Sequence, residues 1–477
     1  MWIALPLAIL SEVCGFLSPK EALGGCRGVC SAWRRVQASW THVQFGQHLD
    51  EAQAVVCGSE GSRIRAVTLL VDHPAIVGLL TCYTRLQRVE LRKVRATETF
   101  RCLADLGQLT ELEVKGACPI TNDGLQHLSK LSKLKVLALR DTRTVTDEGM
   151  RHMAHLRKLE SFCLNFTCDV TQSGVQHLAL LPRLKTLDLT CGDRVRALQC
   201  LSRCQTLQSL TVESCEEFDD DGARDLPVGL RVLNLRGTAV SGESLTRLTN
   251  LQELDLSNCY HLTNIGHLVG AHSLTNLNVV ACPITDNALQ YMSLVPSLQC
   301  LGFSAGSRVT PEGLLHISKM HWLRRLRFDL AGRASFQHLS GLVNLQALHL
   351  SDGNVRNSEF AHLSGLQKLE NLTLSRLHRT TDDALEYLRD LNLKMLRLHA
   401  CPVNGLGLRY FDKLTNLHTV EIEYCTDVSD ESLTSVFSLP GLRTLKLHGY
   451  MPKVSPAFRR QLDRSFTFVD GVFTLLA

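Results

Sequence analysis

The sequence predicts an elongated α/β solenoid in which one short unit is stacked many times. Three observations predict this fold class. The pattern LxxLxL recurs through most of the chain, at intervals of 21 to 25 residues. In many units a helix-start pattern follows it, with a Thr or Ser before acidic and then apolar residues. The 477 residues are 44% hydrophobic and 21% charged, a globular composition that one repeat array can absorb in place of about three ordinary domains.

The LxxLxL segments predict short parallel strands. In LQELDL, Leu251, Leu254 and Leu256 point inward, while Glu253 and Asp255 alternate to the outside. One unit cannot bury its own leucines, so each neighbour completes the core of the unit before it. The spacing is that of leucine-rich repeats. The seventeen expected units start at residues 64, 86, 109, 134, 159, 184, 207, 230, 251, 274, 298, 323, 345, 369, 393, 417 and 442.

The second half of the unit predicts helices on the convex side of the solenoid. The segments 118–125, 144–150, 282–289 and 427–433 share a hydroxyl N-cap, an acidic first turn and an apolar inner face. These repeat segments resemble the cysteine-containing subclass of leucine-rich repeats that is common in F-box proteins.

Cysteine and histidine recur at fixed phases of the unit. We expect the cysteines nine positions into the unit to fill a buried turn, because they come singly and not in the CxxC pairs of a zinc site. They are Cys215, Cys259, Cys282, Cys401 and Cys425. Seven histidines stand seven residues before the next repeat, and we expect them to pack at helix ends, with a metal ladder as the alternative. They are His127, His152, His177, His267, His316, His338 and His362.

The N-terminal stretch MWIALPLAILSEVCGFL has the apolar periodicity of a helix. No Lys or Arg precedes its apolar run and Glu12 interrupts it, so we expect a retained helix and not a secretory signal. Ser18 and Pro19 begin a second predicted helix, and CSAWRRV supplies a short third one. Three such helices bury little core and leave apolar side chains for a partner.

Residues 3–40 resemble the F-box, the short motif that docks onto a Skp-type adaptor. The matching stretch is LPLAILSEVCGFLSPKEALGGCRGVCSAWRRV, although Leu7 and Ala8 replace the usual acidic residue and Cys14 stands where an aromatic is common. The resemblance assigns adaptor binding to Leu5, Pro6, Ile9, Leu10, Val13, Leu17, Leu23, Val29, Cys30 and Trp33.

The combined resemblance implies a substrate receptor of an SCF-type ubiquitin ligase. Its partners would be a Skp-type adaptor, through it a cullin, and an unknown protein substrate. The expected organisation is an F-box-like module at 3–40, a first strand and N-terminal cap at 41–63, the repeat array at 64–448 and a C-terminal cap at 449–477. Such a receptor makes no bond itself, and its expected location is cytoplasmic or nuclear.

The outward strand positions are the candidate substrate surface, because solenoids bind through their concave face. Basic residues gather there between acidic pairs, at Arg325, Arg327, His349, Arg397 and His399. Arginine forks suit carboxylate or phosphate, so an acidic or phosphorylated segment is one interpretation of the ligand. A solvated face with chance clustering would give the same pattern, and the sequence leaves both interpretations open.

Several function classes have no support in the sequence. None of the motifs GxSxG, HExxH, GxxxxGK[ST], GxGxxG or paired CxxC is present, so we expect no catalytic residues, metal or cofactor. The formal net charge is only +4 without a block of like charges, and no apolar run is long enough to span a membrane, so we expect neither nucleic acid nor a membrane as partner. A repeat scaffold without a ligase role, or a secreted repeat protein, remains the alternative.

Overall fold

The computed structural model describes most of the chain from residue 85 to residue 458 and several shorter stretches. The F-box-like segment 3–40, with all ten predicted adaptor-binding residues, lies outside the described residues. The chain forms two compact units, Met1–Ala239 and Val240–Ala477. The described residues are 42–45, 64–69, 80, 83, 85–92, 97–116, 120–140, 142–165, 169–190, 194–263, 265–306, 308–332, 335–450, 452–458, 466–469 and 472–475.

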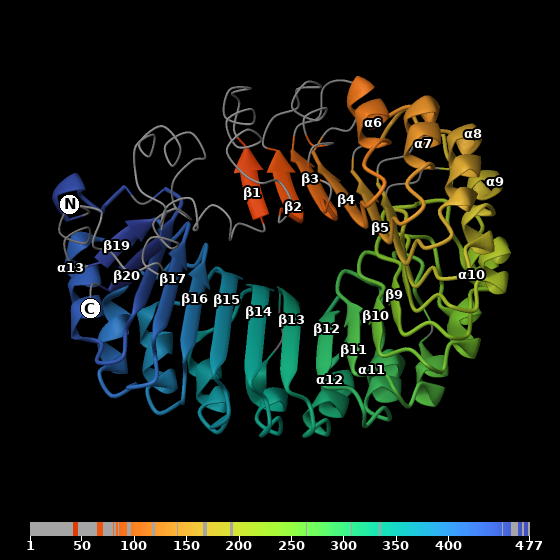
Figure 1. Cartoon of the computed structure of the whole chain (residues 1–477). Helices are drawn as coiled ribbons and strands as arrows, with labels where there is room; N and C mark the ends of the chain where they lie inside the picture. Colours follow the sequence, from red (N-terminus) through yellow and green to blue (C-terminus); the bar gives the residue numbers. More distant parts are fainter. Residues whose placement is uncertain are drawn as a thin grey trace, which may run out of the picture. The chain divides into compact units, whose positions relative to one another are not determined.

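The first unit is a parallel sheet in which each described strand pairs with the next along the chain, with helical turns along one side (Figure 1). Its strands are β1 (His42–Phe45), β2 (Ala66–Leu69), β3 (Arg88–Arg92), β4 (Glu111–Lys115), β5 (Val136–Leu139), β6 (Ser161–Leu164), β7 (Thr186–Asp188), β8 (Ser209–Thr211) and β9 (Val232–Asn234). Its helices are α6 (Glu98–Leu103), α7 (Asn122–Leu128), α8 (Asp147–Met150), α9 (Gln172–Val175) and α10 (Asp220–Ala223), with 3-10 helices η3 (Arg151–His155), η4 (Leu178–Leu180) and η5 (Gln199–Arg203).

The second unit repeats this arrangement and ends in an antiparallel hairpin. Its parallel strands are β10 (Glu253–Asp255), β11 (Asn276–Val279), β12 (Cys300–Ser304), β13 (Arg325–Gly332), β14 (Ala347–Gly353), β15 (Asn371–Leu377), β16 (Met395–His399), β17 (Thr419–Glu423) and β18 (Thr444–His448). Strand β20 (Val472–Leu475) then pairs antiparallel with β18, and β19 (Phe466–Val469) with β20.

Helical turns line one side of the sheet in the second unit as well (Figure 1). The α-helices are α11 (Asp286–Met292), α12 (Pro311–Ser318) and α13 (Asp430–Thr434). The 3-10 helices are η6 (Glu243–Arg247), η7 (Gly266–Gly270), η8 (Phe336–Leu339), η9 (Asn357–Leu363), η10 (Asp382–Leu388), η11 (Leu406–Phe411) and η12 (Ser435–Ser438).

The leucine pattern places the core as the sequence predicts. Every expected repeat start is followed by one strand, eight in the first unit (β2–β9) and nine in the second (β10–β18). Leu251 and Leu256 are fully buried, and Leu254 stands opposite Leu277 of the next strand. Each inner row is therefore a ladder of stacked apolar side chains, and the predicted leucine-rich-repeat solenoid is confirmed.

Adjacent repeats are also joined on the helix side, by a side chain at the start of one helix. Asp147 accepts hydrogen bonds from the backbone N–H and the hydroxyl of Thr171, at 2.7 and 2.6 Å. Asn122 accepts from the backbone N–H of Thr146, the N-cap of the next helix, at 3.1 Å and donates to the Thr146 hydroxyl at 2.9 Å. The hydroxyl of Thr146 makes no bond to its own helix, so the prediction that it caps that helix by itself is wrong. Asn122 of the preceding repeat engages both the N–H and the hydroxyl of Thr146 instead.

The recurrent cysteines fill the turn after the strand, as predicted. Cys282 donates from Sγ to the Leu256 carbonyl at 2.9 Å, and Cys425 to the Leu398 carbonyl at 3.7 Å. Burial raises the pKa of both thiols to about 12, so they are unreactive thiols at neutral pH. All cysteines among the described residues are free.

Candidate protein-binding surface

We call the side of the sheet away from the helices the strand face. Alternate strand residues point to it, because side chains of a β-strand alternate between the two sides. In the second unit the parallel register lines up Arg327 with His349, and Arg397 with Glu421. Thr373 of β15 stands between His349 and Arg397. The five predicted residues thus lie on one face, and their contacts divide them into three groups, with His349 between the first group and the second.

The first group is Arg325 and Arg327 on β13. Both side chains are exposed, and neither makes an ion pair or hydrogen bond with another described residue. On β12 the position beside Arg327 is Gly302, so no side chain stands between Arg327 and Asn278 of β11. A Cβ at Gly302 would lie 2.7 Å from Asn278 Oδ1. The side chain of Asn278 therefore reaches over Gly302, and the two guanidinium groups of β13 stand beside it without a neutralising partner among the described residues.

Arg397 belongs to a second group in which its charge is already neutralised. Its guanidinium contacts the carboxylate of Glu421, and Lys446 Nζ lies 2.6 Å from Glu421 Oε1. The Glu421 side chain is fully buried, which alone would raise its pKa, but hydrogen bonds from Lys446 and Arg397 outweigh burial and the pKa is lowered. This triad bridges β16, β17 and β18.

The pKa of His349 is lowered by burial and by the positive charges on this face. Burial and the neighbouring Arg327, Arg397 and Arg376 lower the pKa of His349 from 6.5 to about 4. The imidazole is therefore neutral at pH 7. As pH falls from about 6.5 towards 4 the unfolded chain takes up the proton first, so His349 reduces stability in that window.

The third group surrounds His399 and contains an aromatic residue that the sequence analysis missed. Ser375 Oγ lies 3.0 Å from His399 Nδ1, and the His399 ring meets Tyr424 edge to face at 5.6 Å. Tyr424 and Tyr450 are 58% and 74% exposed. The signal for Tyr424 was available: it occupies the position after the strand where other repeats carry Ser214, Asn258 or Ala281.

Beside these groups, Arg376 and Asp352 form a paired charge at the ends of β14 and β15. Arg376 donates through Nε and an Nη to the two oxygens of Asp352, each at 2.5 Å. The hydrogen bond from Arg376 holds the pKa of Asp352 below its usual range. Both residues have left-handed backbone conformations, with φ of 50° and 57°.

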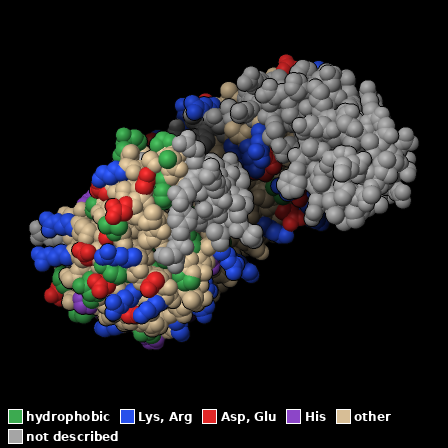
Figure 2. Space-filling view, turned by 90° about the vertical axis from the view of Figure 1, so that its left-hand side faces the viewer, with side chains coloured by type: hydrophobic (Ala, Val, Ile, Leu, Met, Phe, Trp, Pro, Cys, Tyr) green, Lys and Arg blue, Asp and Glu red, His purple; other side chains and the backbone are tan. Residues whose placement is uncertain are grey.

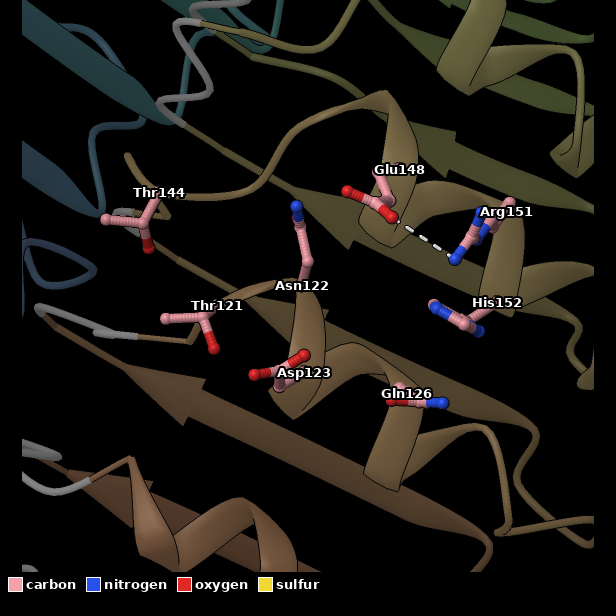
Figure 3. Close-up of a pocket in the computed structure, with 8 residues that line it drawn as sticks. All are labelled: Thr121, Asn122, Asp123, Gln126, Thr144, Glu148, Arg151 and His152. Atoms are coloured by element: carbon pink, nitrogen blue, oxygen red, sulfur yellow. Dashed lines mark ion pairs between the residues drawn. The ribbon is translucent and has the colours of Figure 1, made fainter.

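A polar hollow of about 330 Å³ lies on the helix side of the first unit, between α7 and the helices α8 and η3 (Figure 3). Glu148 pairs with Arg151 at 3.2 Å along the wall that α8 and η3 form. The Thr144 hydroxyl donates to the Ile120 carbonyl at 2.6 Å, and Asn122 bonds Thr146. Asn122 and Thr144, two of its eight lining residues, thus serve the connection between repeats.

Charges of both signs are mixed on the face of the described residues that Figure 2 shows. Figure 2, which looks onto the C-terminal part of the chain, shows basic and acidic side chains interspersed over the described surface. Within the described ranges, no three His, Cys, Asp or Glu side chains are grouped as metal ligands would be. Nor does any helix described here have the length and apolar character needed to cross a bilayer.

Comparison with known proteins yields structures of repeat proteins at low identity. No family model matches the chain. An internalin from Listeria monocytogenes shares 17% identity, with 81% of this chain and 94% of that one covered and a TM-score of 0.44. A leucine-rich-repeat protein from Leptospira interrogans shares 14% identity, with 85% of this chain and 99% of that one covered and a TM-score of 0.49. TLR13 in complex with ssRNA13 shares 18% identity, with 82% of this chain covered and a TM-score of 0.48. The match covers 62% of the TLR13 chain, so this chain spans less than two thirds of its length. All three TM-scores are below 0.5, and the fold assignment rests on the repeat geometry described above.

Proposed function

We propose that this chain is a non-catalytic substrate receptor of an SCF-type ubiquitin ligase, which holds a target protein on the strand face of its repeats. One observation carries the binding role. The repeats join through inner leucines, backbone pairing and helix-side bridges, so outward positions such as Arg325 and Arg327 are exposed without an ion pair or hydrogen bond to a described residue. Charged side chains that the fold does not need, on a rigid sheet, suit recognition of another protein.

The ligase role is supported by the resemblance of residues 3–40 to the F-box. In this proposal the apolar side chains of that segment, including Leu10 and Trp33, dock on a Skp-type adaptor and through it a cullin. The chain contributes proximity: it raises the effective concentration of target lysines near a charged conjugating enzyme. The proposal places the protein where such ligases act, in the cytoplasm or the nucleus.

The test is a pull-down of the full chain with purified Skp-type adaptor from the same organism. We expect wild type to bind, and Leu10→Asp and Trp33→Ala to reduce binding at least tenfold. Leu180→Asp is the matched control, because Leu180 is 65% exposed on η4 and lies outside the F-box-like segment. Arg325→Glu with Arg327→Glu should leave adaptor binding unchanged.

A repeat scaffold that joins proteins without ubiquitin transfer is the alternative. It predicts that folded wild-type chain does not bind the adaptor, while strand-face variants still impair capture of the target. Adaptor binding that Leu10→Asp and Leu180→Asp reduce equally would also remove the support for a specific F-box contact.

A further inference from the structure

We propose that the strand face of β13–β17 binds an extended segment of a partner protein that carries a phosphoryl group at one end and a Lys or Arg about six residues away. This inference rests on the proposed protein-binding role of that face. It adds a second, oppositely charged contact and a spacing between the two.

The phosphoryl contact is the pair Arg325 and Arg327. Their guanidinium groups are exposed without a carboxylate partner in the described part of the chain, whereas Arg397 is engaged by Glu421 and Arg376 by Asp352. Beside Arg327, Gly302 is covered by the side chains of Asn278 and Val280, so the phosphoryl group would be held above the sheet by the two exposed guanidinium groups themselves. Arginine forks bind phosphate oxygens through paired charge-assisted hydrogen bonds.

The basic contact is formed by Glu423, Tyr424 and Tyr450. Glu423 ends β17, and its carboxylate is half-buried without an ion pair among the described side chains. Tyr424 adopts a left-handed backbone (φ 54°), as the residue at the same phase does in other repeats, such as Asn258 and Ala400, so this conformation belongs to the turn of the repeat. Glu423 and the exposed Tyr424 are consecutive, and the Tyr424 ring lies against Gly449, the neighbour of Tyr450. A Lys or Arg side chain bound there would gain an ion pair with the carboxylate and a cation–π contact with a ring.

The tyrosine platform is held in place by its neighbours. The ring of Tyr424 lies so close to Gly449 that a Cβ there would be 2.6 Å from it, and Gly449 has φ of 86°, which favours glycine. His399 contacts the same ring edge to face. The ring is therefore fixed before a ligand arrives, which lowers the entropy cost of binding.

The spacing follows from the strand order. Four strand intervals separate β13 from β17, and at about 4.8 Å each they span about 19 Å. Glu423 is also two residues further along its strand than Arg327, which brings the separation to about 20 Å, the length of about six extended residues. The Glu423 carboxylate disfavours a nucleic acid, whose phosphates would continue along this line.

The test uses fluorescein-labelled ten-residue Gly/Ser peptides with one phosphoserine and one Arg, in both chain directions, titrated against the full chain by fluorescence anisotropy. We expect the best direction with five intervening residues to bind at least tenfold more tightly than a peptide without the phosphate, and about fivefold more tightly than one without the Arg. Shortening the spacer to two residues should lower the affinity by the same factor of about five, because the peptide can then reach only one of the two contacts.

Two charge changes locate the contacts. Arg325→Glu with Arg327→Glu should abolish the gain in affinity that the phosphate gives. A peptide with Lys in place of phosphoserine should restore binding to this double variant. Its control is Arg194→Glu with Arg196→Glu, the same charge change at two exposed arginines off the strand face. Glu423→Lys should remove the gain in affinity that the Arg of the peptide gives. Glu253→Lys, the same change on β10, should not.

The outcomes separate this inference from the proposed function. Binding that is independent of spacer length or of Glu423, or a ten-nucleotide RNA that binds as tightly as the peptide, overturns the bipartite site. An unphosphorylated peptide with Glu in place of phosphoserine that binds equally well overturns the phosphoryl assignment. No peptide binding by a chain that still binds the adaptor defeats this inference alone. Peptide binding by a chain that does not bind the adaptor defeats the ligase role alone.

Discussion

Replacing Asp147 with Ala should destabilise the first unit by about 2 kcal/mol, although the residue lies on no predicted binding surface. Its two oxygens accept from the backbone N–H and the hydroxyl of Thr171, the residue that begins the next helix. Loss of a helix N-cap partner costs about 0.5–2 kcal/mol. Hydrogen bonds to a charged acceptor lie at the upper end of the range for single bonds. Asp147 is only partly exposed, so water restores part of the loss and about 2 kcal/mol remains.

Two further variants show whether the hydrogen bonds or the charge matter. Asp147→Asn should cost less than about 1 kcal/mol, because Asn122 already bonds Thr146 in this way one repeat earlier. Glu148→Ala removes the same charge from the next residue, but Glu148 makes only an exposed pair with Arg151, so it should cost about 0.5 kcal/mol or less.

The assay combines urea unfolding, followed by circular dichroism, with hydrogen exchange at the Thr171 amide. We expect the urea midpoint to fall least in Glu148→Ala, more in Asp147→Asn and most in Asp147→Ala. Hydrogen exchange at the Thr171 amide should be faster only in Asp147→Ala. If Asp147→Ala were no worse than Glu148→Ala, or if the Thr171 amide kept its protection, the helix-side bridge would not be a stabilising contact.

Three other predictions concern the turns and the strand face. Cys282 and Cys425, with a pKa of about 12, should resist iodoacetamide at pH 8 in the native protein and react after unfolding, as mass spectrometry would show. Arg327→Ala should raise the pKa of His349 from about 4 towards 6.5, measured by NMR titration, and an unchanged pKa would show that Arg327 does not contribute to the shift. Glu421→Ala should lower the free energy of unfolding by about 2 kcal/mol, because it leaves two cations without their buried partner. That is below the usual 3–5 kcal/mol, since both cations are partly exposed.

The sequence predicts the repeat fold well because its signals are local. Leu254 and Cys282 each sit at a fixed phase of a short unit, and the unit can bury them in only one way. The helix starts were also predicted, but the cap of Thr146 was assigned to its own hydroxyl. Its true partner, Asn122, is 24 residues away, and only stacking of neighbouring repeats brings the two together.

The candidate surface was predicted less well because charge pairing across strands depends on register. Arg397 was grouped with Arg325 as one basic stretch, yet Arg397 faces Glu421 and Arg325 faces no acid on its neighbouring strands. Once the repeats are aligned the difference is visible in the sequence, since Arg397 and Glu421 occupy the same position of consecutive units. Tyr424 was missed because its position follows the strand, where exposure depends on the turn and not on alternation.

The division of labour within the repeat explains why the strand face can specialise. Stability comes from inner leucines, buried turns and helix-side bridges such as Asp147–Thr171, and none of these uses an outward strand position. A substitution at Arg325 or Glu423 therefore changes recognition at little cost in folding, whereas Glu421, buried beneath its two cations, does not have that freedom. Because the strands are stacked at a fixed interval, each change also places a charge at a defined distance from every other. A partner segment can thus be selected by the spacing of its charges as well as by their sign, and the peptide series with varied spacers measures that property directly.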